Sequence, residues 1–213
     1  MKKILAAAVV AAAFFLQISH ASTGWLSSYN YTWNGINDTT YTLNGGNNPA
    51  STTGTPVGAF DGANLGTFNT GYTLFLNSAI SAWADGGDTY SNFSLWYRVY
   101  SGTPTGSFTQ VSASSISGIG GNNFRGFASG ADLGGRANGT YTVETYLSRT
   151  HTWDGGSQIN YLLTSGNTTS IPSSNYFTAT YQVIPEPSTY ALLTLAAGGL
   201  GAHVIRRRRL RRQ

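Results

Sequence analysis

Apolar and polar residues alternate along the stretch from Asn92 to Tyr100, and this pattern constrains the fold more than any other feature of the sequence. Phe93, Leu95, Tyr97 and Val99 fall on one face of that stretch. Successive side chains of a strand point to opposite faces of a sheet, so a period of two predicts a strand that is buried on one side. We therefore expect a fold built from half-buried β-strands.

The same period recurs between turn signals along much of the chain. Further strands are expected at residues 41–43, 71–77, 107–112, 140–149, 159–163 and 176–184, with a short one near Phe60. Short strands separated by Gly- and Asn-rich turns are typical of an antiparallel β-sandwich of jelly-roll or immunoglobulin-like topology. Only residues 79–84 suggest a short helical turn before the glycines that follow. The sequence predicts an all-β domain.

The first 21 residues have the parts of a secretory signal peptide. Residues 2–3 are basic, residues 4–18 form an apolar run, and Ser19-His20-Ala21 places small residues before a cleavage site. We expect cleavage between Ala21 and Ser22, which leaves residues 22–184 as the exported β-sandwich domain.

The C-terminal segment, residues 185–213, has three features in a fixed order. It begins with Pro185-Glu186-Pro187, continues with an uncharged apolar run at residues 190–205, and ends with the arginines Arg206, Arg207, Arg208, Arg209, Arg211 and Arg212. As a helix the run is about 24 Å long, slightly shorter than a hydrocarbon core of ~30 Å. We expect a transmembrane helix whose arginines stay in the cytoplasm, with an extended tripeptide just outside the membrane. An ordinary anchor and a processing signal both fit these features.

The tripeptide, the Leu/Ala/Gly-rich run and the terminal arginines together resemble the PEP-CTERM sorting domain of Gram-negative bacteria. The resemblance is limited to residues 185–213. It implies that an exosortase, a membrane peptidase, recognises Pro185-Glu186-Pro187 and removes the tail. The implied route is export, transient anchoring in the inner membrane, and delivery to the cell surface or to an extracellular matrix of exopolysaccharide or biofilm.

Positive charge is concentrated in the two targeting segments. The whole chain has 12 Lys+Arg and 8 Asp+Glu and a net charge of +4, but residues 22–184 keep only Arg98, Arg125, Arg136 and Arg149, fewer than their acidic residues. A nucleic-acid-binding face needs clustered lysines and arginines, so nucleic acid is not expected as a partner. The chain also has no cysteine, which excludes disulfides and thiolate sites.

Catalytic signatures are weak in the exported domain. Its one histidine, His151, would need an orienting acid and a nucleophilic serine to act in a hydrolase, and the sequence has no G-x-S-x-G stretch. The acidic residues lie mostly beside glycine or asparagine, which is more typical of turns than of paired glycosidase carboxylates. We expect no enzymatic activity; a small secreted hydrolase is the weakest of three alternatives.

Two groups of residues are candidates for binding. Asp85, Asp88 and Asn92 offer oxygen atoms for Ca²⁺ in a Gly-containing loop, although their spacing is not that of an EF-hand and capped turns are the favoured interpretation. No other cofactor is expected.

The second group is aromatic: Trp96, Tyr146 and Trp153 offer flat rings on which a sugar can stack, although core filling is favoured for most aromatic residues here. The leading hypothesis is a non-enzymatic surface or matrix protein associated with exopolysaccharide or biofilm. The alternative is a carbohydrate-binding module that uses exposed aromatic residues, with or without calcium.

Overall fold

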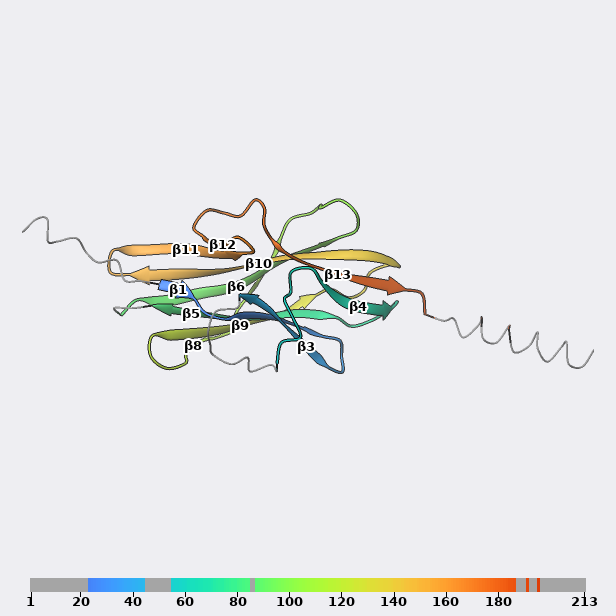
Figure 1. Cartoon of the computed structure of the whole chain (residues 1–213), viewed down its shortest axis with the longest axis horizontal. Helices are drawn as coiled ribbons and strands as arrows, with labels where there is room; N and C mark the ends of the chain where they lie inside the picture. The colour runs from blue at the N-terminus through green and yellow to red at the C-terminus, as the bar shows by residue number, and fades with distance from the viewer. Residues whose placement is uncertain (1–22, 45–54, 85–86, 187–190, 192–194, 196–213) are drawn as a thin grey trace, which may run out of the picture.

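The computed structural model describes residues 23–44, 55–84 and 87–186, together with Ala191 and Leu195, which are helical. The described part of the domain is all-β and forms two stacked sheets (Figure 1). Its strands are β1 (Thr23–Trp25), β2 (Ser28–Trp33), β3 (Asp38–Asn44), β4 (Ala63–Asn69), β5 (Phe75–Ala84), β6 (Thr89–Tyr100), β7 (Thr109–Ser112), β8 (Ile116–Gly118), β9 (Asn123–Asp132), β10 (Gly139–Trp153), β11 (Gly156–Leu163), β12 (Gly166–Thr168) and β13 (Phe177–Ile184).

The six-stranded sheet, here called sheet A, is arranged around β5. Its order is β3-β2-β5-β9-β8, and β1 continues the edge of β5 that β2 occupies. The helical turn expected at residues 79–84 is wrong, because these residues form the second half of β5. Hydrogen bonding to strands on both edges outweighs the high helix propensity of the alanines there.

The seven-stranded sheet, sheet B, is arranged around the 15-residue strand β10. One edge of β10 pairs with β6, which also pairs with β7, while β11 and β13 divide the other edge between them. Strand β4 pairs with β13 in parallel, whereas the other described strand pairs are antiparallel. Alternation is the same in both kinds of pair, so the sequence pattern does not distinguish the parallel one.

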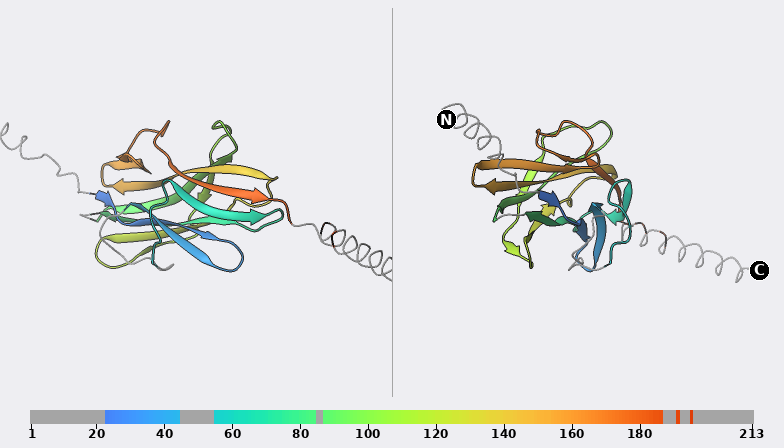
Figure 2. Two further views of the ribbon diagram at one scale, coloured as in Figure 1. Left: turned by 45° about the vertical axis from the view of Figure 1, so that its right-hand side comes forward. Right: turned by 60° about the vertical axis from the view of Figure 1, so that its left-hand side comes forward.

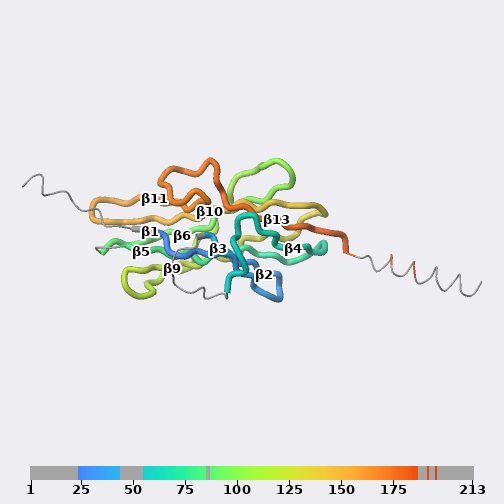
Figure 3. Tube along the Cα trace, in the orientation of Figure 1, coloured from blue at the N-terminus to red at the C-terminus, as the bar shows by residue number. Residues whose placement is uncertain are grey.

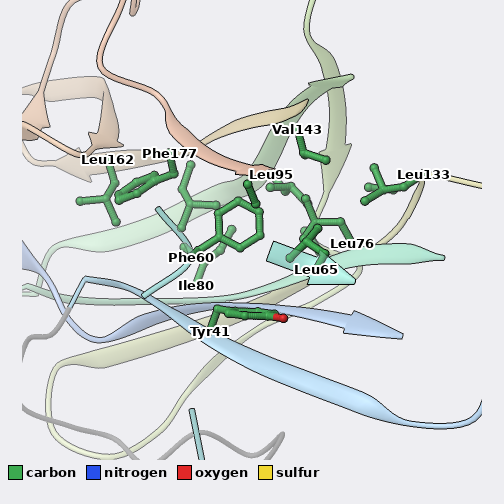
Figure 4. Packing of buried hydrophobic residues seen from close by; sticks show 14 of the residues in the cluster. Tyr41, Phe60, Leu65, Leu76, Ile80, Leu95, Leu133, Val143, Leu162 and Phe177 are labelled. Atoms are coloured by element: carbon green, nitrogen blue, oxygen red, sulfur yellow. The ribbon is translucent and has the colours of Figure 1, made fainter. Parts of the chain in front are cut away.

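The main core lies between the sheets (Figure 4). Ile80 from sheet A and Leu95, Val143 and Phe177 from sheet B are almost fully buried. Phe60, in the segment before β4, is also completely buried, and its ring packs edge-on against Tyr41. These side chains supply the hydrophobic stabilisation that a cysteine-free domain needs.

A bulge in β6 changes which side chains face the core. Ser94 pairs with Ser148 but Ser91 pairs with Thr150, so Asn92 and Phe93 together lie opposite one residue of β10. Asn92 has a φ of 52°, a left-handed conformation that asparagine tolerates better than most residues. Strict alternation would turn Tyr90 away from Phe93. The bulge instead brings their ring centroids within 6.0 Å.

The two ends of the sandwich carry different elements (Figure 2). Strand β13 ends near the hairpin that joins β2 and β3, and we call this the β13 end. Strand β1 begins at the opposite end, the β1 end, where β10 turns into β11. The tube in Figure 3 shows both ends in the orientation of Figure 1.

Candidate functional site

The sorting tripeptide begins directly after the last core strand. Val183 is buried and Ile184 ends β13, while Pro185 and Glu186 are exposed and belong to neither sheet. Thr70 fixes this exit, because its backbone N–H and its hydroxyl both donate to the Ile184 carbonyl, at 2.9 and 3.2 Å. Proline cannot donate to a sheet ladder, so the strand stops here and Pro185 and Glu186 are accessible.

The other targeting features fall outside the described residues. These are the Ala21–Ser22 cleavage site, Pro187, the arginine cluster and all of the predicted span except Ala191 and Leu195. Among the residues that the structure describes, no helix is long and apolar enough to cross a membrane.

Trp96 and Tyr146 lie together on the outer face of sheet B. Their rings are nearly parallel, with centroids 5.7 Å apart, and the Trp96 indole N–H donates to the Ser148 hydroxyl at 2.8 Å. Phe108 and Tyr176, from two loops, pack against Tyr146, which is only 6% exposed. This burial raises the pKa of Tyr146 to about 12, and the neighbouring Tyr161 and Tyr176 make smaller contributions in the same direction. The pair is part of a second, smaller core.

An ion pair that sequence reasoning missed holds one of these loops over the second core. Arg98 and Glu144 face each other on β6 and β10, with nitrogen–oxygen distances of 2.6 Å. The Tyr100 hydroxyl donates to the same carboxylate at 2.9 Å, and Arg98 also donates to the Gly106 carbonyl. The sequence did offer a signal, because residues of opposite charge stand in two of the expected strands. Arg98 and Glu144 are 46 residues apart, and such residues stabilise a sheet when they face each other across paired strands.

Trp153 lies on the opposite face of β10 from Tyr146, so the structure does not bring the three predicted binding residues together. Its ring stacks on His151 with centroids 5.1 Å apart. The His151 Nε2 atom is 2.7 Å from Asp88 Oδ2, and the Tyr90 ring also contacts the imidazole. The hydrogen bond that the structure gives this histidine therefore goes to a carboxylate at a strand end.

The predicted calcium ligands are only partly described. Asp85 lies outside the described residues, Asp88 is paired with His151, and the exposed Asn92 forms the bulge and donates to the Thr150 hydroxyl at 3.4 Å. The described residues contain no group of three or more His, Cys, Asp or Glu side chains that are placed to hold a metal ion. Calcium binding at this loop stays a prediction.

Arg149 occupies an unexpected position between the two sheets. It is completely buried, with its guanidinium carbon 4.3 Å from the centre of the Trp25 ring and 4.4 Å from that of Tyr90. Its Nη1 atom donates to the Gly24 carbonyl at 2.7 Å, while Nε and Nη2 have no hydrogen-bond partner in the described structure. Burial lowers the pKa of Arg149 to about 10, so it remains charged at neutral pH.

The Trp25 ring also borders a cleft of about 370 Å³ where the two sheets meet. Its indole N–H donates to the Asn167 side-chain oxygen at 2.9 Å. The cleft is lined by residues of β1, β3, β11, β12 and the turn between β11 and β12: Gly24, Trp25, Leu43, Leu162, Leu163, Thr164, Gly166 and Asn167. Ligand pockets usually occupy a few hundred Å³ or more and combine apolar walls with a few polar groups. The position of Trp25 beside Asn167 depends on the approach of β1 to β12, so no local sequence pattern indicated this cleft.

Comparison with known families adds a finding about the end of the chain. Residues 183–209 match the model of the PEP-CTERM protein-sorting motif. The chain carries a PEP-CTERM sorting motif. This confirms the resemblance noted in the sequence and supports export and sorting by an exosortase, with passage through the membrane. The PEP-CTERM match begins at Val183, so it overlaps the last two residues of β13. No curated protein matches the chain.

Proposed function

We propose that this chain is a non-enzymatic protein that an exosortase releases to the cell surface or into an extracellular matrix of exopolysaccharide or biofilm. The observation that carries the proposal is the PEP-CTERM motif, whose Pro-Glu-Pro tripeptide follows directly after the last core strand in the sequence. A peptidase reaches Pro185 and Glu186 without unfolding the sandwich, because both are exposed beyond β13. Removal of the tail leaves the core strands intact.

The non-enzymatic part of the proposal is supported by how the charged side chains are used. His151 pairs with Asp88, and Arg98 pairs with Glu144 inside a packed network. Such pairs hold strands and loops in place. Sustained hydrolysis of a polysaccharide or an ester by the purified protein, abolished in His151→Ala, would refute this part.

The processing step is tested by mass spectrometry of the protein recovered from cells that contain an exosortase. The wild type is expected to lack residues 206–213, whereas a Pro185→Ala/Pro187→Ala variant is expected to keep them. Pro104→Ala, which changes an exposed loop proline, is the matched control and should be processed normally. A mature wild-type protein that still ends in Arg206–Gln213 would leave a simple membrane anchor.

A second candidate function, carbohydrate binding, is favoured by the cleft beside Trp25 rather than by Trp96 and Tyr146. An indole ring bordered by an amide offers a stacking surface together with hydrogen-bonding groups. Glycan-array binding by the mature protein should fall in Asn167→Leu and persist in Asn64→Leu, an exposed asparagine of β4. Equal binding by both variants would exclude this cleft.

A further inference from the structure

The β13 end of the sandwich exposes apolar side chains at the tip of the β2–β3 hairpin. Ile36 is 83% exposed and Trp33 is 38% exposed. The Trp33 ring stacks on Phe75, with centroids 5.8 Å apart and an interplanar angle of 21°. The tryptophan is therefore held in place by the first residue of β5, and both side chains are available to a partner.

The hairpin tip lies on the same end of the molecule as the exit of the last strand. Ile184 is hydrogen-bonded to Thr70, and a Cβ atom built on Gly35 would lie 3.9 Å from Thr73 Cβ. The short segment 70–75 thus connects the two features, and both views in Figure 2 place the β2–β3 hairpin and the end of β13 on the same side of the domain. Ile184 is itself 37% exposed.

The length of chain after β13 limits how far this end is from a membrane. Residues 185–189 separate Ile184 from the predicted span, and an extended chain covers at most about 3.6 Å per residue. The end of the sandwich therefore stays within about 20 Å of the bilayer while the tail is anchored. The exposed apolar residues are on the side of the domain that this tether holds toward the lipid.

We propose that Trp33 and Ile36 rest in the lipid headgroup boundary of the outer leaflet until the tail is removed. This inference rests on the proposed function, in which the tail anchors the chain in the membrane until an exosortase removes it. Tryptophan suits the headgroup boundary, because its ring is apolar and its N–H is polar, and an exposed isoleucine buries apolar area there. The contact fixes the orientation of the domain and places Pro185 and Glu186 beside the membrane, where a membrane peptidase acts.

Charge near the hairpin indicates which lipids take part. Asp38 lies opposite Trp33 in the register of β2 and β3. Asp132 lies opposite Phe75 in the register of β5 and β9. These two acids outnumber Arg136, the cation that acts on Tyr72 and lies over the Tyr141 ring, so anionic headgroups gain no net attraction. The contact is therefore apolar, favours zwitterionic lipid and depends little on salt. Two side chains are too few to hold the domain by themselves, so removal of the tail also ends the contact.

The absence of cysteine from the sequence permits a direct test, because each introduced thiol is unique. An environment-sensitive fluorophore is placed on Ile36→Cys, Ile171→Cys or Leu195→Cys of the full chain in phosphatidylcholine vesicles. Ile171, 80% exposed in the loop before β13, is the matched control for Ile36. We expect a blue shift and loss of most emission to spin-labelled lipid at positions 36 and 195, at low and high salt, and neither effect at position 171.

Each other outcome contradicts a specific step. A label at position 36 that behaves like the one at 171, with position 195 quenched, overturns the lipid contact and leaves tail anchoring intact. An unquenched label at 195 refutes the anchoring step and the lipid contact with it. Equal quenching at all three positions would show adsorption without orientation and would also overturn the proposal.

Discussion

Arg149 and Trp25 join the two sheets at the β1 end: the guanidinium carbon on β10 lies 4.3 Å from the centre of the indole ring on β1. The Tyr90 ring also contacts the guanidinium, with its centre 4.4 Å from the same carbon. Among the described residues no carboxylate pairs with this charge, which two rings and one carbonyl stabilise instead. Cation–π contacts are worth most when the cation is removed from water.

The contribution of the Arg149 charge to stability can be separated from the contribution of the volume that its side chain fills. Arg149→Ala should lower the free energy of unfolding by about 3–4 kcal/mol, because it leaves a cavity between the sheets and an unpaired Gly24 carbonyl. Arg149→Met should cost only about 1 kcal/mol, since an apolar side chain of similar length avoids the desolvation of a charge. Urea unfolding measures both. A methionine variant as unstable as the alanine variant would show that the charge itself is required.

The bulge in β6 is expected to depend on the left-handed backbone at Asn92. Asn92→Gly should change the free energy of unfolding by less than about 0.5 kcal/mol, because glycine adopts this conformation freely. Asn92→Val should lower it by about 1–3 kcal/mol, because a β-branched side chain is strained at positive φ. If thermal unfolding found the two variants equally stable, the proposed conformation at residue 92 would be wrong.

Close approach of the sheets should make Gly126 intolerant of a side chain. A Cβ atom built there would lie 2.7 Å from a ring atom of Phe93, so Gly126→Ala should cost about 1–3 kcal/mol. Gly118 on the neighbouring strand β8 is the control, since its nearest neighbour would be 3.9 Å away. Chemical denaturation of both variants gives the comparison, and equal losses would contradict the packing of Phe93 on β9.

Stability at alkaline pH should depend on Tyr146. Its pKa is raised to about 12, whereas a tyrosine in the unfolded chain titrates near pH 10. The folded protein holds this proton more tightly, so its contribution is fully present below about pH 10 and declines as the pH rises toward 12. Tyr146→Phe should therefore lose less stability across this range. Urea midpoints measured between pH 9 and 11 test this, and parallel curves for both proteins would contradict it.

Alternation predicted the strands in which one face alone is apolar. Residues 92–100 and 140–149 lie within β6 and β10, and residues 176–184 correspond to β13. Strand β9 was missed because its core face uses Gly126, Ala128 and Ala131, whose small side chains produce no clear period. Propensity also failed in β5, where pairing on both edges converts an Ala- and Ser-rich stretch into a strand.

The candidate sites were predicted unevenly for a similar reason. Pro185-Glu186-Pro187 is a local signal, so the sequence alone was enough to recognise it. Asp88 and His151, by contrast, are 63 residues apart and are brought together by the pairing of β6 with β10. The burial of Arg149 depends on the position of sheet A, on which a local pattern carries no information. Features that depend on long-range pairing were therefore the ones missed.

The parallel pairing of β4 with β13 also sets the order of events during export. Strand β13 inserts between β10 and β4 and supplies Phe177, Tyr181 and Val183 to the core. More than a hundred residues separate β4 from this partner along the chain, so sheet B is completed only after the chain as far as Ile184 has crossed the membrane. The sorting motif thus reaches the outer side of the membrane at the point when β13 can complete sheet B.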